Sequence, residues 1–287
     1  MSKPTVTGFH DPATGTMTYL VSDERHRRAA VVDPVWDYEP KSGHLDTRSV
    51  DRLSLHIERR ELTLDWILET HVHADHLSAA QLLKHRFGAP VAIGEHVRAV
   101  QRNFAALFHV EGEVPADGSQ FDRLLADGET IEIGTLSARV LHTLGHTPAC
   151  ISYLVEDVAI VGDTLFMPDA GTARCDFPGG DARQLYRSIQ RILALPEQTR
   201  IFVGHDYGGN GREPAWEASV AQHRRLNIHV GAGREEDEYV RMREARDRTL
   251  EAPTLILPAL QVNIRGGRLP GAESNGTIYL KIPLDRL

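Results

Sequence analysis

LDWILETHVHADHL, residues 64–77, is the stretch that decides the fold. It begins with an apolar run of strand length and ends in four potential metal ligands within six positions, His71, His73, Asp75 and His76. In an extended chain, side chains two positions apart point the same way, so His71 and His73 can converge before the chain turns. Open α/β sheets bind ligands at the carboxyl ends of their strands, so this placement favours a metal site over a solvated His-rich loop.

Three further strand ends combine glycine with ligand-type residues. They are LGHT (144–147), VGDT (161–164) and VGHDY (203–207), which contain His146, Asp163, His205 and Tyr207. Glycine lets the backbone turn sharply beside a ligand, and each ligand-type residue lies just beyond an apolar run. One such residue alone is more often a helix cap or a hydrogen-bonded core residue. Four strand ends of this kind predict one shared site at one edge of a sheet.

Composition narrows the class of protein. The chain has 287 residues, 41% hydrophobic and 25% charged, as expected for one large α/β domain or two small ones. It has no apolar run of about 18 residues, and residues 1–8 do not resemble a signal peptide, so we expect no membrane span and a cytoplasmic location. The net charge of −8 argues against nucleic acid and favours a small-molecule substrate. Cys150 and Cys175 are expected to be free thiols.

The hydrophobic pattern alternates between strands and helices. Strands are expected at 18–21, 29–33, 90–93, several places within 121–142, 151–155, 158–161 and 201–203. Helices are expected at 77–87, 95–108, 181–193 and 235–250, and between Asp46 or Thr47 as a cap and Ile57. Residues 35–43 are predicted to form a surface loop, and residues 253–258 and 265–276 an ordered surface lobe or loop. No chemistry is visible in the first hairpin, 18–33. We expect one domain over 1–287, with a C-terminal extension from about residue 224.

The ligand pattern carries a family resemblance. HVHADH followed by GHT, GDT and GHDY resembles the metallo-β-lactamase superfamily over about residues 16–207, which implies an α/β fold, an αββα sandwich with the metal site at the edges of its two sheets. Within the superfamily, GTARCDF (171–177) and HDY (205–207) resemble the persulfide dioxygenases more than the glyoxalase II thiolester hydrolases. A bacterial subgroup with a longer segment near 35–58 and a C-terminal extension is similar. Ala173 and Cys175 depart from the Gly and Thr of the family pattern.

The resemblance implies a ligand set. In the persulfide dioxygenases one Fe(II) per chain is held by two His and one Asp, which match His71, His146 and Asp163. In that case His73, Asp75, His76 and His205 orient the ligands or bound water. A two-zinc enzyme would use all seven side chains: His71, His73 and His146 on one metal, Asp75, His76 and His205 on the other, and Asp163 bridging. The sequence leaves one metal and two metals both open.

The implied activity is oxidation of glutathione persulfide by O₂ to sulfite, with release of glutathione. Arg174 is expected to bind a glutathionyl carboxylate, because an Arg fork holds a carboxylate with two hydrogen bonds; the alternative is a surface ion pair. Tyr207 is expected to be catalytic or to donate to the substrate carboxylate; the alternative is a capping or core hydroxyl. Cys175 is either a pocket thiol or a small buried residue.

Two rival functions stay open. One is a two-zinc thiolester hydrolase of glyoxalase II type, which would hydrolyse S-acyl glutathione. The other is a non-catalytic binding module that keeps its metal for stability, although a structural site is usually closed. The sequence also leaves homodimerisation open.

Overall fold

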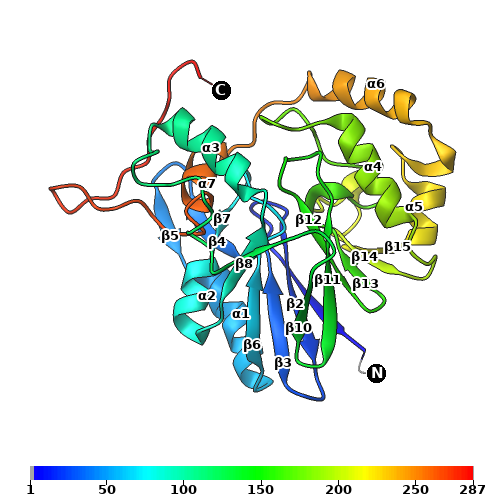
Figure 1. Cartoon of the computed structure of the whole chain (residues 1–287), viewed down its shortest axis with the longest axis horizontal. Coiled ribbons are helices and arrows are strands. Elements are labelled where there is room, and N and C mark those ends of the chain that lie inside the picture. Colours follow the sequence, from blue (N-terminus) through cyan, green and yellow to red (C-terminus); the bar gives the residue numbers. More distant parts are fainter. Residues whose placement is uncertain (1–2, 287) are drawn as a thin grey trace.

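The computed structural model describes residues 3–286, which form two six-stranded sheets packed face to face (Figure 1). The first sheet consists of β1 (Thr5–His10), β2 (Met17–Asp23), β3 (Arg28–Val32), β6 (Thr63–Leu68), β8 (Val91–Gly94) and β9 (Arg123–Leu125), in this order. The second consists of β10 (Thr130–Ile133), β11 (Leu136–His142), β12 (Ile151–Val155), β13 (Val158–Ile160), β14 (Arg200–Phe202) and β15 (Glu217–Ser219).

Alternation along the strands separates the core into layers. In β2, Tyr19 and Val21 face the second sheet, whereas Leu20 faces the helices on the outside of the first sheet. Those helices are α1 (Arg48–Arg59), α2 (Ala80–Phe87) and α3 (Val97–Phe108). On the second sheet, Ile201 and Val203 pack outward against α4 (Ala182–Leu193), α5 (Val220–Leu226) and α6 (Glu236–Asp247). Because strand side chains alternate between faces, one chain builds the inner core and both outer layers, which confirms the predicted αββα sandwich.

Most predicted helices and strands are present with shifted ends. Helix α1 buries Val50 and Ile57 as expected, but neither proposed cap accepts a hydrogen bond from a backbone N–H of the first turn. Thr47 occupies the cap position and its hydroxyl instead donates to Asp51 Oδ2 at 2.8 Å, while Asp46 pairs with Arg48. Asp181 does cap α4, accepting a hydrogen bond from the Gln184 amide. None of the helices within residues 3–286 is long and apolar enough to cross a membrane.

The predicted surface loop at 35–43 is wrong, because residues 35–39 form strand β4 (Val35–Glu39). This strand pairs with β5 (His44–Asp46) and with β7 (Leu77–Ser78), giving a small third sheet. Val, Trp and Tyr favour strands, and the Pro and Gly that suggested a loop lie in the hairpin turn after Glu39. The helix expected from Leu77 begins only at Ala80, because Leu77 and Ser78 pair with β4.

The C-terminal extension holds a helix where a surface lobe or loop was predicted. Helix α7 (Ile256–Asn263) is buried along most of its length and packs against both the first sheet's outer core and β7. Pro258 is tolerated because it lies in the first turn, where a backbone N–H has no partner within the helix. The prediction of a single domain over 1–287 stays a prediction.

Candidate metal centre

The predicted ligand residues meet at one end of the two sheets. The loop after β6 carries His71, and the loop between β11 and β12 carries His146. Asp163 lies in a short turn of 3-10 helix, η1 (Gly162–Thr164), directly after β13, and His205 follows β14. Because β3 and β6 run parallel, as do β13 and β14, the strands deliver their following residues to the same edge.

One cluster contains His71, His146 and Asp163, and their ligand atoms all lie within 4.8 Å of one another. Asp163 Oδ2 is 4.0 Å from His71 Nε2 and 3.7 Å from His146 Nε2. All three side chains are buried. The structure therefore brings together the three residues that the family resemblance implied as iron ligands.

A second cluster shares the Asp163 carboxylate. His205 Nε2 lies 3.4 Å from Asp163 Oδ1 and 3.4 Å from Asp75 Oδ2. Asp75 in turn contacts His76 Nδ1 at 3.0 Å and accepts a hydrogen bond from the Thr16 hydroxyl at 3.1 Å. The two oxygens of Asp163 thus face different groups of ligands, as expected for a carboxylate that can bridge two metal ions.

Several buried ligand atoms at the centre make no hydrogen bond within residues 3–286. They are His71 Nε2, His73 Nδ1, His76 Nε2 and Asp163 Oδ1. Leaving one buried polar atom unpaired costs about 1–3 kcal/mol, so several unpaired atoms in one place indicate that a bound group normally pairs with them. Imidazole nitrogens and carboxylate oxygens in this arrangement fit a transition-metal ion, and the donor set suits Fe(II) and Zn²⁺ alike.

Hydrogen bonds to Nδ1 orient the rings of His71 and His146 so that Nε2 of each faces Asp163. His146 Nδ1 donates to the carbonyl of Arg174 at 2.7 Å. The Thr70 hydroxyl donates to Asp33, so its oxygen accepts from His71 Nδ1 at 3.0 Å. Burial lowers the pKa of both imidazoles, and the neighbouring charge of His73 lowers that of His71 further. Neutral rings with a free Nε2 lone pair are the form that binds metal.

Sequence reasoning missed two carboxylates beside His73. Its Nε2 lies 3.0 Å from Asp33 Oδ1 and 3.4 Å from Glu69 Oε2. Burial lowers the His73 pKa, but the charge and hydrogen bonding of Asp33 and Glu69 outweigh burial and raise it well above its usual value. Burial raises the pKa of Glu69. Asp33 follows β3, whose Val32 pairs with Leu68 of β6, so the strand-end argument used for the other ligands would have found it.

Two of the motif glycines are needed for close approach. A Cβ on Gly204 would lie 2.4 Å from Asp163 Oδ1, and one on Gly162 would lie 2.5 Å from the Thr70 hydroxyl oxygen. Gly162 also has a positive φ of 49°. Any side chain at either position would displace Asp163 or the loop that carries His71.

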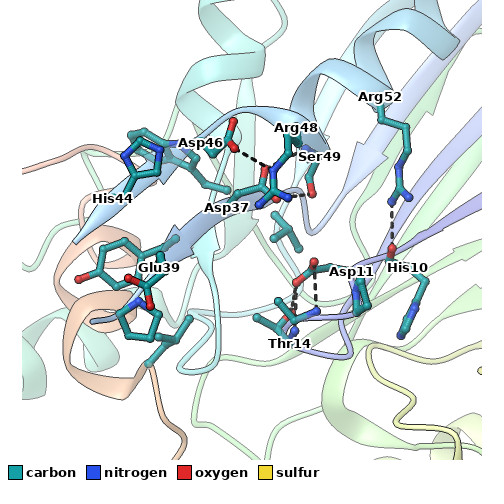
Figure 2. A pocket seen from close by; sticks show the side chains of 17 residues that line it. His10, Asp11, Thr14, Asp37, Glu39, His44, Asp46, Arg48, Ser49 and Arg52 are labelled. Atoms are coloured by element: carbon teal, nitrogen blue, oxygen red, sulfur yellow. Dashed lines mark hydrogen bonds and ion pairs between the residues drawn. The ribbon is translucent and has the colours of Figure 1, made fainter. Parts of the chain in front are cut away.

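A cleft of about 480 Å³ leads to both clusters. Phe166 and Phe177 give it apolar walls, and its far wall comes from the C-terminal segment, including Leu250 and Arg246. A separate cavity of about 440 Å³ lies between the β1–β2 turn and β4 (Figure 2), and no predicted site residue lines it. The first cleft is therefore the access route to the metal centre.

Arg174 lines this cleft, but its guanidinium already has partners. Asp176 accepts two hydrogen bonds from it at 2.6 Å each, and the Glu251 carbonyl accepts a third at 2.6 Å. This geometry matches the ion-pair alternative given above for Arg174. Arg246, which the sequence analysis did not single out, is exposed on the same cleft and forms no salt bridge within residues 3–286.

Tyr207 lies at the cleft mouth with its side chain 70% exposed. Its ring stacks on His205, with ring centroids 5.9 Å apart and planes 8° apart, so it covers a predicted ligand rather than capping a helix. Cys175 is buried, burial raises the pKa of its thiol, and its amide donates to Asp247, all of which favour the small buried residue over a reactive thiol.

The chain matches the family model described as "Metallo-beta-lactamase superfamily" over residues 12–205. A relative from Burkholderia pseudomallei, named a probable metallo-hydrolase, is 53% identical over 99% of this chain and all of its own length. A beta-lactamase hydrolase-like protein from Xylella fastidiosa is 51% identical over 99% of this chain, which spans only 65% of that relative's length. Glyoxylase B2 from Dictyostelium discoideum is 47% identical over 96% of this chain and 95% of its own.

Two proteins named ETHE1 are also similar to this chain. The human mitochondrial persulfide dioxygenase ETHE1 is 29% identical over 69% of this chain and 67% of its own. The crystal structure of ETHE1 from Myxococcus xanthus superposes with a TM-score of 0.73 and 32% identity, covering 92% of this chain and all of the other. Since the family model spans well over half of the residues and the fold and ligand clusters agree with it, this chain belongs to the metallo-β-lactamase superfamily and is a metal-dependent enzyme of that kind.

Proposed function

We propose that the protein is an Fe(II)-dependent persulfide dioxygenase acting on glutathione persulfide. The observation that carries the proposal is the cluster of two His and one Asp, His71, His146 and Asp163, opening on a cleft. This 2-His-1-carboxylate set is the usual ligand set of non-haem iron oxygenases. The likeness to the ETHE1 structure from Myxococcus xanthus, at 32% identity over 92% of the chain, supports the same choice.

The reaction balances without a further reductant. Glutathione persulfide, O₂ and water give glutathione, sulfite and protons; the sulfane sulfur loses four electrons and O₂ gains them. The S–S bond breaks, and the sulfur of glutathione leaves as the thiol. Bound Fe(II) would supply open coordination positions for sulfur and O₂ and the redox chemistry between them.

The chain's own groups hold and shield the site. His71, His146 and Asp163 would hold the iron, with the imidazoles oriented by the Thr70 hydroxyl and the Arg174 carbonyl. Asp75 and His205 contact each other at 3.4 Å on the opposite side of Asp163 and would orient bound water or substrate. Tyr207, stacked on His205, partly covers this side from solvent.

The cleft fits a substrate with an apolar stem and distal carboxylates. Phe166 and Phe177 would pack against the carbon chain of the glutathionyl group. Arg246 would bind a carboxylate, because it is the arginine of this cleft without a carboxylate partner among the described residues. Arg174, whose fork is filled by Asp176, would shape the loop beside His146 instead.

A second candidate function rests on a specific observation, the bridging position of Asp163. A binuclear site could hold a hydroxide between two metals, as a thiolester hydrolase of glyoxalase II type requires. The names of two similar proteins, a probable metallo-hydrolase and a glyoxylase, support this alternative. A purely structural metal fits less well, because structural sites are usually closed and this one opens on a cleft.

One experiment separates these functions. Protein purified without added metal is analysed for iron and zinc, and then assayed for O₂ consumption with glutathione persulfide and for hydrolysis of S-lactoylglutathione. We expect about one iron per chain and persulfide-dependent O₂ uptake. Two zinc ions per chain with thiolester hydrolysis and no O₂ uptake would replace the dioxygenase by the hydrolase.

A further inference from the structure

Asn263, the last residue of α7, contacts the loop that carries the HVHADH motif. Its Nδ2 donates to the carbonyls of His73 and His76 at 2.9 and 2.8 Å. Its Oδ1 accepts from the amide of Ser78 at 2.8 Å. The side chain is 4% exposed, so these contacts form out of water. One buried amide therefore joins three points of the loop from a position about 190 residues further along the chain.

The loop needs such a partner. It leaves β6 after Leu68 and reaches β7 only at Leu77, so the backbone between them is irregular and buried. Buried carbonyl and amide groups outside a helix or sheet need side chains or water to pair with. Asn is suited to this role because its one side chain offers two donors and an acceptor. Asn263 thus supplies hydrogen bonds that neither strand can supply.

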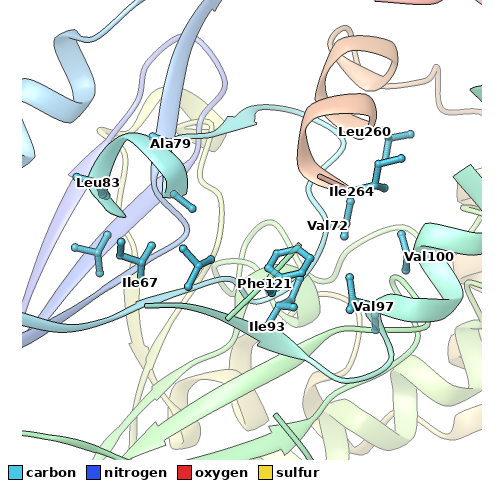
Figure 3. Packing of buried hydrophobic residues seen from close by; sticks show 14 of the residues in the cluster. Ile67, Val72, Ala79, Leu83, Ile93, Val97, Val100, Phe121, Leu260 and Ile264 are labelled. Atoms are coloured by element: carbon cyan, nitrogen blue, oxygen red, sulfur yellow. The ribbon is translucent and has the colours of Figure 1, made fainter. Parts of the chain in front are cut away.

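Helix α7 is itself fixed relative to the loop. Leu260 and Ile264 belong to the same buried cluster as Val72 of the motif and Val97 and Val100 of α3 (Figure 3). On its other side, Ala259 and Val262 pack against Leu77, at the end of the loop. Apolar packing on two sides of α7 therefore fixes the amide of Asn263 relative to the loop at 71–77.

We infer that Asn263 is a positioning residue for the metal centre, and that the C-terminal segment is part of the scaffold of that centre. The match to the superfamily model ends at residue 205, so α7 lies outside the matched region. The Burkholderia pseudomallei relative, in contrast, aligns over 99% of this chain, α7 included. The inference holds for one metal or two and for either reaction, because every version of the site uses the loop at 71–76.

The physical consequence is a change in metal affinity. When Asn263 holds the loop, His71, His73, Asp75 and His76 are ordered before the metal arrives. Without it, metal binding must also order the loop, and that entropic cost weakens binding. Loss of groups that orient metal ligands typically lowers affinity about 10–100-fold.

The test compares two buried amides of one helix. Asn263→Leu keeps the volume and removes all three bonds to the loop. Gln261→Leu is the matched control: Gln261 is 2% exposed, and its amide bonds the carbonyls of Leu257 and Lys281 rather than the loop. Metal affinity is measured by chelator competition with Fe(II) and with Zn²⁺. Hydrogen exchange of the metal-free proteins is followed in the peptide covering residues 69–79.

We expect Asn263→Leu to bind metal about 10–100-fold more weakly and to exchange faster at 69–79. Gln261→Leu is expected to match wild type in metal affinity and in hydrogen exchange at 69–79. Its exchange should be faster only near Lys281. Asn263→Asp keeps the acceptor for Ser78 but places a carboxylate against two carbonyls, so it should weaken metal binding at least as much. A helix that merely adds stability would not produce this ordering.

Three outcomes would overturn the inference. The first is a folded Asn263→Leu protein with wild-type metal affinity and wild-type exchange at 69–79. The second is an equal loss of affinity in Gln261→Leu. The third is that neither Asn263 variant folds while Gln261→Leu does, which would assign Asn263 to global stability alone.

Discussion

At the scale of single residues, the Asp163 carboxylate decides how the centre is divided. Its Oδ2 faces His71 and His146, and its Oδ1 faces His205. One iron needs only the first side, whereas two metals would use both. The effects of removing residues on each side therefore distinguish one-metal from two-metal versions of the site.

His71→Ala should abolish iron binding, because it removes one of the three proposed protein ligands. His71 Nε2 makes no hydrogen bond among the described residues, so the substitution breaks no other interaction of that atom. Iron per chain, measured by elemental analysis, should fall from about one to near zero. His223→Gln, which changes a buried His of α5 away from the centre, should keep its iron. Iron retention by His71→Ala would exclude His71 as a ligand.

His205→Ala should lower turnover while leaving most of the iron bound. His205 contacts Asp163 from the side opposite His71, so the three proposed iron ligands stay in place and only the groups proposed to orient water or substrate change. Such changes typically cost about 10–100-fold in activity. The same is expected of Asp75→Ala. Complete metal loss in either variant would show that these side chains are ligands and would favour the two-metal site.

Arg246→Ala should weaken substrate binding. A hydrogen bond between charged groups contributes about 1.5–3 kcal/mol, and because Arg246 is exposed we expect the lower end, about a tenfold higher KM for glutathione persulfide with little change in kcat. Arg174→Ala should raise KM less, since Asp176 already occupies its fork. A larger KM effect in Arg174→Ala than in Arg246→Ala would return carboxylate binding to Arg174.

At the scale of elements, strands and helices with strong periodicity were predictable, and those stabilised by distant partners were not. The pattern located the amphipathic helix that buries Val50, Leu53 and Ile57. Strand β4 was missed because it pairs with β7, about 40 residues away, and local Pro and Gly suggested a loop. Likewise, the candidate metal ligands near Gly were predicted from local motifs, and the structure brings them together. Asp33 was missed because the first hairpin was expected to carry no chemistry, although Asp33 also follows a strand that pairs with β6. Asn263 was missed because it reaches the site only through the packing of α7.

Helix α6 supports the loop beside His146 through a buried ion pair. Arg243, 1% exposed, pairs with Asp247 at 2.6 Å and donates to the Thr172 carbonyl at 3.0 Å. Asp247 in turn accepts from the Cys175 amide at 2.8 Å. Through the neighbouring Arg174 carbonyl, this pair helps to place the His146 ring.

Arg243→Met should therefore destabilise the protein strongly, because it leaves the Asp247 charge buried without its partner. Removing one member of a buried pair typically costs about 3–5 kcal/mol in the free energy of unfolding. Urea denaturation measures this change. Arg183→Met is the control, because Arg183 of α4 forms an exposed ion pair with Glu236 and Asp237 of α6. This substitution should leave the unfolding midpoint nearly unchanged. Equal midpoints for the two variants would contradict the supporting role of Arg243.

At the scale of the whole molecule, the segment beyond the superfamily match closes the fold around the site. Helix α7 contacts the loop of the HVHADH motif, and α6 contacts the segment 172–175, whose Arg174 carbonyl accepts a hydrogen bond from His146. In the segment between α5 and α6, His229 accepts a hydrogen bond at Nδ1 from the Thr172 amide at 2.9 Å. Protonation of that nitrogen would remove the bond, so acid should loosen the same contact region.

The stability of the metal-free protein should fall in acid partly through His229 and His223. The pKa of each is lowered from 6.5 to about 4, by burial for His223 and by burial together with the charges of Arg243, Arg246 and Arg234 for His229. Between pH 6.5 and 4 the unfolded chain binds a proton at each site that the folded chain does not bind, so stability present above pH 6.5 is lost as the pH falls. Each proton contributes a slope of about 1.4 kcal/mol per pH unit.

Urea denaturation across this range, compared between wild type and His229→Gln, isolates the contribution of one residue from that of other titrating groups. The slope for His229→Gln should be smaller by nearly one proton, since Gln cannot titrate but fills a similar volume. His85→Gln is a surface control, because His85 is exposed and its ring forms no ion pair among the described residues. An unchanged slope in His229→Gln would mean that His229 binds its proton over the same pH range in the folded and unfolded chains, and its proposed contribution to acid sensitivity would be excluded.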